Sequence, residues 1–519
     1  MAQLIGLGIE NFRIFKEATE FDFAPLTLLT GANNSGKSSL IKALLLLADN
    51  ADKNNVGDLD FSGFFSEIHN LATFDLTLNN ENIEQNNNIK FELFYEIEGS
   101  RYKLLLEYEK HLTNSRLLYF SVQRLNEDTN IYFLICGIRH EGNHSYSSFL
   151  DIAYFIQEKF KNLLSKNDYF EQDNTTALNL NIINEEVKKI VTHINPNLSN
   201  EFLDNLNKYT VRWLSYTPNN VNKLDIGHIY NQLHYEKISA FAKLATIGNF
   251  PYIKREFLDN KDYQPFFEAL STFSLRDILK KEYAEYLLEI PNDAFLFIKT
   301  LRNQITFEYE GAIRANSKRL YKNIWEGTAF NGLLNRFNKM YFSNESKEKL
   351  FIKKWLKNLG IADDIQFIWD EQVGTRIRLY CNNKELDLTD LGFGVTQLLP
   401  ILIHIVICKT EYLIIEEPEN SLHPDFQSEL ADLFVDAYQQ FKVKFILETH
   451  SEYFIRKLQV LTKKGVISPK DSVIYYENSL PNSNLKINIG SNGILSDELG
   501  NRFVNESNNL VIELYELPN

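Results

Sequence analysis

The sequence predicts an α/β protein with a mixed core sheet, an antiparallel β-subdomain and an inserted helical domain. Three observations predict this fold class. A glycine-rich turn separates an apolar strand from a helix at residues 31–38, strand patterns follow between residues 74 and 138, and helices alternate with strands between residues 301 and 475. Helix–strand alternation is typical of a parallel sheet, whereas short strands joined by tight turns form antiparallel sheets.

The length of 519 residues allows about three domains. We expect an N-terminal lobe over residues 1–145, a helical insertion over residues 146–300 and a C-terminal lobe over residues 301–519. The net charge of −15 argues against a surface that coats DNA, although it leaves open a local basic groove formed by two copies. The most apolar window, Leu398–Cys408, is too short for a bilayer span, so we expect no membrane association. Three scattered cysteines without metal-ligand spacing predict a reduced, cytoplasmic protein.

The N-terminal lobe is predicted to be rich in strands. We expect strands at Leu4–Ile9, Glu20–Phe23 and Leu26–Leu29, followed by a helix at Ser39–Leu47. Five further segments predict an antiparallel meander, with a hairpin turn at Gly99-Ser100. These segments are Phe74–Leu78, Ile89–Ile97, Arg101–Tyr108, Leu117–Leu125 and Ile131–Ile138.

Helical spacing dominates residues 146–300, which carry no chemical motif and fit a packing module, a dimer arm or a docking site for a partner. The helical segments are Phe149–Leu164, Asn184–Ile194, Tyr235–Ile247, Pro265–Leu270 and Leu275–Leu288. The C-terminal lobe returns to an α/β pattern, which predicts a parallel sheet completed by crossover connections. Its first elements are a strand at Gln304–Tyr309, helices at Ser317–Tyr341 and Lys347–Leu359, and strands at Ile365–Trp369, Arg376–Tyr380 and Glu385–Leu388.

The segment Gly31–Ser38 matches the phosphate-loop pattern G-x-x-x-x-G-K-[ST] at every fixed position. Its strand–turn–helix setting directs backbone N–H groups and a positive helix end at an anion. Lys37 is predicted to reach the β- and γ-phosphates, and the Ser38 hydroxyl to bind Mg²⁺. We therefore expect a nucleoside triphosphate to bind here. The expected contacts are Asn33, Asn34, Ser35, Gly36, Lys37, Ser38 and Ser39.

The apolar strand Tyr412–Ile415 ends in Glu416-Glu417-Pro418-Glu419. A buried strand that delivers two acids at its carboxyl end fits a Walker B motif, which phosphoryl transfer needs beside a phosphate loop. Glu416 is predicted to orient Mg²⁺ through water and Glu417 to activate the attacking water. We expect Glu419 to be a solvated or interface charge.

Two further motifs flank these acids. His450 follows the strand Phe445–Glu448 and is predicted to reach the γ-phosphate by a hydrogen bond. Gly392 and Gly394 precede the apolar helix Leu398–Cys408, where a glycine-rich start exposes N–H donors to an anion. A plain turn is the alternative interpretation of these glycines.

The order of these motifs resembles ABC-type ATPases of the SMC-like branch, which act in chromosome maintenance, recombination and double-strand-break repair. It is most similar to prokaryotic AAA family ATPases of anti-phage and toxin–antitoxin systems, which are related to the ATPase half of overcoming-lysogenization-defect proteins. The resemblance covers residues 1–80 and 300–500 and implies an ABC-type P-loop ATPase head. It makes Asn420–Pro424 the D-loop, His450 the switch histidine and Arg13 an arginine that approaches the nucleotide, although a surface position fits Arg13 nearly as well. The implied signature loop, which binds nucleotide on a second copy, contains Gly392, Gly394, Thr396 and Gln397.

The resemblance implies that two heads enclose two ATP molecules with Mg²⁺, and that hydrolysis by Glu417 separates them. Our leading hypothesis is a dimeric ATP-hydrolysing switch that regulates a partner effector in anti-phage defence. The alternatives are a DNA-binding SMC-like repair or chromosome-maintenance ATPase, and a scaffold that binds ATP with little turnover. The acidic balance and the lack of a long coiled-coil pattern favour the first over the DNA-binding alternative, and intact Glu417 and His450 favour turnover over a scaffold.

The segment His140-Glu141-Gly142-Asn143-His144 matches the zinc-protease pattern H-E-x-x-H. That spacing binds zinc only on a helix, where both histidines share one face. Gly142-Asn143 instead predicts a hairpin turn, so we expect no zinc site here.

Overall fold

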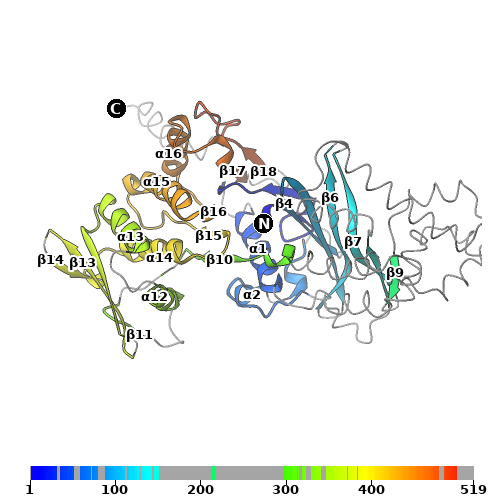
Figure 1. Cartoon of the computed structure of the whole chain (residues 1–519), viewed down its shortest axis with the longest axis horizontal. Helices are drawn as coiled ribbons and strands as arrows, with labels where there is room; N and C mark the ends of the chain where they lie inside the picture. The colour runs from blue at the N-terminus through cyan, green and yellow to red at the C-terminus, as the bar shows by residue number, and fades with distance from the viewer. Residues whose placement is uncertain are drawn as a thin grey trace, which may run out of the picture. The chain divides into compact units, whose positions relative to one another are not determined.

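The computed structural model describes residues 2–31, 36–51, 59–71, 73–79, 88–111, 114–127, 130–142, 145–150, 213–216, 297, 300–312, 314, 318–322, 329–340, 346–370, 372–382, 384–477 and 484–499 (Figure 1). These residues form two compact units. The first contains Met1–Arg13 and Asp49–Ile305, and the second contains Ile14–Ala48 and Thr306–Asn519. The phosphate loop therefore belongs to the same unit as the C-terminal motifs. Most of the predicted helical insertion lies outside the described residues.

The first unit contains an antiparallel sheet with the strand order β1-β4-β5-β6-β7-β8-β9. The strands are β1 (Gln3–Glu10), β4 (Asn88–Ile97), β5 (Ser100–His111), β6 (Asn114–Asn126), β7 (Ile131–Gly142), β8 (Ser145–Leu150) and β9 (Trp213–Tyr216). This sheet confirms the predicted meander. The predicted helix Phe149–Leu164 is wrong at its start, because residues 149 and 150 pair with β7, and its remainder lies outside the described residues.

Two local predictions in this unit are also wrong. Phe74–Leu76 form a 3₁₀ turn, η1, because the Thr77 hydroxyl and backbone N–H both donate to the Phe74 carbonyl and close the chain on itself. The β4–β5 hairpin turns at Glu98-Gly99, one residue before the predicted position, and both residues have positive φ angles, 49° and 78°. Positive φ at both central residues is the requirement of a type I′ turn. A short helix, α2 (Phe64–Ile68), completes the unit.

The core of the second unit is a sheet with the order β10-β15-β16-β3-β17-β18. All neighbouring strands are parallel except β18, which runs antiparallel to β17. This confirms the α/β class with a mixed core sheet, and the buried pattern of β15 is that of a strand covered on both faces. The strands are β3 (Leu26–Gly31), β10 (Phe307–Glu310), β15 (Tyr412–Glu416), β16 (Lys444–Glu448), β17 (Ser472–Glu477) and β18 (Asn484–Ile487). Strand β2 (Thr19–Asp22) packs its Phe21 ring edge-on against Tyr475 in β17.

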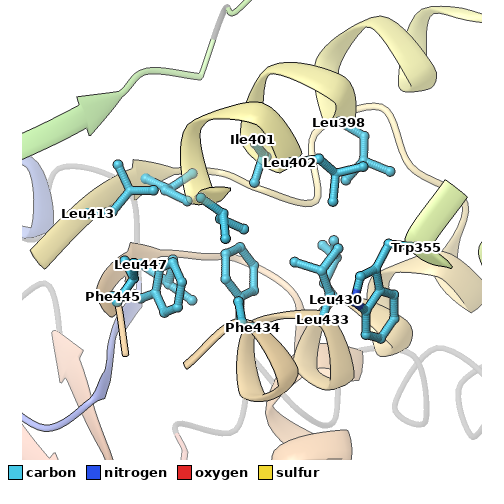
Figure 2. Close-up of a cluster of buried hydrophobic side chains, with 14 of the residues drawn as sticks. Trp355, Leu398, Ile401, Leu402, Leu413, Leu430, Leu433, Phe434, Phe445 and Leu447 are labelled. Carbon is cyan, nitrogen blue, oxygen red and sulfur yellow. The ribbon is translucent and has the colours of Figure 1, made fainter. Parts of the chain in front are cut away.

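Helices of this unit pack apolar side chains against the sheet and against one another. Figure 2 shows Leu398 and Leu402 of α14 facing Phe434 of α15, with Leu413 of β15 and Phe445 of β16 beside them. The helices are α1 (Lys37–Ala51, which enters the first unit at Asp49), α12 (Ala329–Met340), α13 (Lys347–Asn358), α14 (Phe393–Ile407), α15 (Pro424–Phe441) and α16 (Glu452–Lys463). Among the described residues, no helix is both long and apolar enough to cross a membrane.

A second, small antiparallel sheet lies in this unit. Its members are β11 (Tyr321–Lys322), β12 (Asp364–Asp370), β13 (Gly374–Cys381) and β14 (Lys384–Asp387), with 3₁₀ turns η4 (Leu388–Asp390) and η5 (Pro469–Asp471) elsewhere. The predicted helix Ser317–Tyr341 is wrong over its first part, because Tyr321 pairs with Thr375 in β13 and the helix begins at Ala329. The Tyr321 ring is buried and packs edge-on against Phe330, which holds this two-residue strand in place.

Candidate nucleotide site

The candidate site lies where parallel strands of the core sheet end. Strand β3 ends at Gly31, β15 at Glu416 and β16 at Glu448, and Glu416 pairs with Glu448 across the sheet. Because parallel strands share one carboxyl edge, ligands of such sheets bind there. The second unit therefore brings the phosphate loop and both predicted acidic strand ends to one edge.

Backbone geometry at the phosphate loop requires glycine at two positions. Gly31 and Gly36 have φ angles of 130° and 127°, which side-chain-bearing residues rarely adopt. Helix α1 begins directly afterwards at Lys37, and the Ser39 N–H donates to the Gly36 carbonyl. The intervening residues 32–35, which include the predicted contacts Asn33, Asn34 and Ser35, lie outside the described residues.

Lys37 and Ser38 both face Glu448. The Lys37 side chain is 3% exposed. Its ammonium group donates to the Gly31 carbonyl at 3.3 Å and lies 4.0 Å from a Glu448 carboxylate oxygen. The Ser38 hydroxyl lies 3.4 Å and 3.5 Å from the two Glu448 oxygens. Burial and the nearby Glu416 charge raise the pKa of Glu448 to about 7, although Lys37 opposes them. The sequence pattern predicts no role for Glu448, yet this residue occupies the same strand-end position as Glu416.

Glu416 is held by the neighbouring strand. The Tyr309 hydroxyl of β10 donates to its carboxylate. Burial and the Glu417 charge raise the pKa of Glu416, against the opposing effects of Tyr309, Lys42 and Arg314. Tyr309 and Lys42 belong to no motif, so no sequence signal marked them.

Glu417 has a left-handed backbone, with φ of 43°. Such a conformation is costly for a residue other than glycine and needs support from its surroundings. The Glu417 N–H donates to the Glu448 carbonyl at 2.7 Å, and the Glu417 carbonyl accepts a hydrogen bond from the Arg314 guanidinium at 3.0 Å. The predicted catalytic carboxylate is thus attached to a fixed backbone.

The prediction for Glu419 is wrong. Its side chain is only 8% exposed, and one carboxylate oxygen accepts a hydrogen bond from the backbone N–H of His450 at 2.5 Å. Burial raises the pKa of Glu419, and this hydrogen bond opposes the rise. Glu419 therefore ties the loop after β15 to the loop after β16, instead of serving as a solvated or interface charge.

His450 has an exposed residue surface at the same sheet edge. Partial burial of the ring and the positive charge of Lys37 lower the pKa of His450, and Glu417 opposes them. The lowered pKa favours the neutral ring at pH 7, and both Lys37 and Glu417 lie near enough to the ring to influence that pKa. His450 therefore lies near the phosphate loop and the acids after β15, as the motif order predicted.

The predicted signature residues separate into two pairs. Gly392 is the exposed N-cap of α14, and a Cβ atom at Gly394 would lie 2.8 Å from the Ser421 carbonyl of the predicted D-loop. Thr396 and Gln397 are buried, with exposures of 1% and 2%. This burial argues against direct contact of these two side chains with nucleotide on a second copy. The expected contact is therefore corrected to the backbone of Gly392, without the side chains of Thr396 and Gln397.

Arg13 lies in the first unit, where it has partners of its own. Its N–H donates to the Thr77 carbonyl at 2.7 Å, and its guanidinium lies 3.5 Å from the Leu76 carbonyl. These contacts give Arg13 a structural role within that unit, and its predicted approach to nucleotide stays a prediction.

The zinc-protease pattern lies where β7 connects to β8, and the pairing of Gly142 with Ser145 agrees with the predicted hairpin turn. His140, Glu141 and Gly142 belong to β7, whereas Asn143 and His144 lie outside the described residues. No cluster of three or more histidine, cysteine, aspartate or glutamate residues that could hold a metal occurs in the part of the chain that the structure describes. Cys136, Cys381 and Cys408 are free thiols.

Comparison with known proteins identifies the family. A family model described as "AAA ATPase domain" matches residues 3–455, which is most of the chain. The chain belongs to the AAA ATPase domain family. The same domain is 24% identical over 282 residues to an uncharacterized protein of Methanocaldococcus jannaschii, in a match that covers 49% of this chain and 34% of that relative. This chain thus spans about a third of that relative's length.

Solved structures similar to this AAA ATPase domain include SMC heads. One is an Smc head domain with an extended coiled coil bound to the C-terminal domain of ScpA, from Pyrococcus furiosus, with 12% identity, a TM-score of 0.36 and coverage of 99% of this chain and 100% of that chain. Another is the SMC head domain from Thermotoga maritima, with 10% identity, a TM-score of 0.34 and coverage of 95% and 97%. At TM-scores of this size, the architecture rests on the strand order and register described above.

Proposed function

We propose that this AAA ATPase domain hydrolyses ATP at the carboxyl edge of its core sheet. The observation that carries the proposal is that Lys37, Glu417 and His450 lie around the end of β16. The Lys37 ammonium lies 4.0 Å from a Glu448 oxygen, the Glu417 N–H donates to the Glu448 carbonyl, and His450 follows directly after Thr449. In this proposal, Lys37 and the N-terminus of α1 bind the phosphates, as a phosphate loop does. Glu417 orients the attacking water and accepts its proton, and neutral His450 donates a hydrogen bond to the γ-phosphate.

The residues present fit the Mg²⁺ that this family implies. Mg²⁺ prefers oxygen ligands, and the Ser38 hydroxyl faces the Glu448 carboxylate while the Glu416 carboxylate is close enough to raise the pKa of Glu448. Ser38 and Glu416 would hold the ion, with Glu416 acting through water. When bound, Mg²⁺ neutralises phosphate charge.

We further propose that two copies of the chain form the working enzyme. Gly392, the exposed N-cap of α14, would contact the nucleotide of the second copy through its backbone N–H group. The assembled pair would then act as an ATP-controlled switch for a partner effector in anti-phage defence. The net charge of −15 favours a protein partner over DNA, which is the alternative.

Replacing Glu417 with Gln tests the hydrolytic role. We expect the Glu417→Gln variant to lose about 10²-fold or more of its turnover, because a general base contributes about that much, while ATP still binds. Glu411→Gln is the matched control, because Glu411 precedes the same strand at its opposite end and pairs with Lys444. Unchanged turnover in Glu417→Gln would contradict the assignment.

The same variant tests the partner. Glu417→Gln purified with bound ATP from its native cell is expected to bring down an effector protein. Salt-sensitive DNA binding without a protein partner would favour the alternative function instead.

A further inference from the structure

We infer that Arg314 is a positioning residue that couples helix α14 to the backbone of Glu417. The inference rests on the proposed catalytic role of Glu417 and goes beyond it by naming what holds that residue in place. Arg314 follows β10, and no motif of the sequence marks it.

The guanidinium of Arg314 binds the backbone at the end of β15. One terminal nitrogen donates to the backbone carbonyls of both Glu416 and Glu417, the latter at 3.0 Å. The Arg314 residue is only 4% exposed, so these hydrogen bonds are shielded from water. A charged donor gives stronger hydrogen bonds than a neutral one, and burial strengthens them further.

The backbone that Arg314 holds is strained. Glu417 has φ of 43°; its carbonyl accepts a hydrogen bond from Arg314, and its N–H donates to the Glu448 carbonyl. Without the guanidinium, the Glu417 carbonyl loses a charged donor and the left-handed conformation loses one of its supports. The direction of the Glu417 side chain depends on this conformation.

Arg314 is in turn bound by α14. Its backbone N–H donates to the Gln397 side-chain carbonyl at 3.0 Å, and Gln397 lies one turn into the helix that begins after Gly392. A displacement of the start of α14 therefore changes a contact of Arg314, which contacts Glu417. This route joins the proposed interface of two copies to the proposed catalytic carboxylate.

A purely structural role for Arg314 is the competing explanation, because Glu310 and Glu419 lie near enough to stabilise its charge. The two explanations differ in what a substitution changes. Loss of a structural arginine lowers stability and nucleotide binding together, whereas loss of a positioning arginine lowers kcat and leaves nucleotide affinity intact.

The test compares Arg314→Met, Arg314→Lys and Gln397→Leu in the full chain, with the ATP Kd, kcat and Tm measured for each. We expect Arg314→Met to lose about 10²-fold in kcat with little change in Kd, since small misplacements of a catalytic group have effects of that size. Arg314→Lys should retain part of kcat because lysine keeps a charged donor. Gln397→Leu should lower kcat without removing any group from the nucleotide site, and it serves if Arg314→Met does not fold.

Arg336→Met is the matched control, because Arg336 pairs with Glu308 on a partly exposed surface of the same unit. Added guanidinium at a non-denaturing concentration should raise kcat of an Arg314→Ala variant but not of the Arg336 control. Unchanged kcat in Arg314→Met and Gln397→Leu would overturn the inference. A weaker ATP affinity and a lower Tm that together account for all of the lost activity would also overturn it. If Glu417→Gln is inactive while Arg314→Met is fully active, only this inference fails; if Glu417→Gln is active, the proposed function fails first.

Discussion

His404 provides the sharpest test of the packing between α14 and the edge strand β10. The ring is 4% exposed, and its Nδ1 and Nε2 donate to Glu310 at 2.7 Å and Glu308 at 2.9 Å. Burial opposes a charge on the ring, but the hydrogen bonds and charges of the two glutamates outweigh it and raise the pKa of His404. Replacing His404 with Leu therefore leaves two carboxylates without their shared cationic partner.

The size of the effect follows from what each glutamate retains. Removing one partner of a buried ion pair typically destabilises a protein by about 3–5 kcal/mol. Glu308 keeps Arg336 and the Lys409 N–H as partners, so we expect about 3 kcal/mol, at the lower end of that range. The assay is urea unfolding of the full chain at pH 6, followed by tryptophan fluorescence, to which Trp355 and Trp369 of the second unit contribute.

The stability that His404 contributes depends on pH in a defined direction. A raised histidine pKa contributes stability that is complete below about pH 6.5 and is lost as the pH rises through the folded-state pKa. Burial alone would raise the pKa of Glu308, but His404, the Lys409 N–H and Arg336 outweigh burial and lower this pKa to about 2. The contribution of Glu308 to stability is therefore present above about pH 4.5 and is lost as the pH falls toward 2. The difference between wild type and His404→Leu should thus be largest between about pH 4.5 and 6.5. If the free energies of unfolding of wild type and His404→Leu differ by less than about 1 kcal/mol in that window, His404 does not stabilise the two glutamates as described. A triple variant that also carries Glu308→Gln and Glu310→Gln should recover part of the lost stability.

Three further predictions follow from particular contacts. Gly394→Ala should lower ATP turnover about tenfold or more, because its Cβ would meet the Ser421 carbonyl. Gly392→Ala should fold normally, because nothing lies within 4 Å of its Cβ. Steady-state ATPase rates and Tm values check both variants. Glu448→Gln should raise the Mg²⁺ concentration needed for half-maximal turnover, since it removes a carboxylate that faces Ser38, and a Mg²⁺ titration that matches wild type would contradict this. Phe434→Ala should destabilise the second unit by about 3–5 kcal/mol, because the ring is fully buried between Phe445 and Phe454; an unfolding midpoint equal to that of wild type would exclude this packing role.

Local patterns predicted the parts of the molecule that depend on local physics. The phosphate loop, the apolar strands before Glu416 and His450, and the meander all follow from periodicity, turn residues and fixed spacings. The predicted positions of Lys37, Glu416 and Glu417 at one sheet edge agree with the strand order, because parallel strands deliver their ends together.

Features that depend on tertiary contacts were not predictable in this way. Arg314 and Tyr309 acquire their contacts because β10 lies beside β15, and nothing within residues 307–314 indicates that neighbour. The sequence predicts a solvated or interface charge at Glu419, but this side chain is buried and the loop after β16 supplies it with a backbone N–H donor. Tyr321 joins a strand only because Thr375 lies opposite, so its helical spacing was misleading.

Single-turnover hydrolysis measures whether Glu417 activates the attacking water. Wild type and Glu417→Gln are each loaded with labelled ATP in the presence of Mg²⁺, chased with unlabelled ATP, and sampled for bound ADP. The proposed mechanism predicts that wild type converts its bound ATP to ADP while Glu417→Gln binds ATP equally well and retains it unhydrolysed. Conversion at the same rate in both proteins would contradict the claim that Glu417 activates the attacking water.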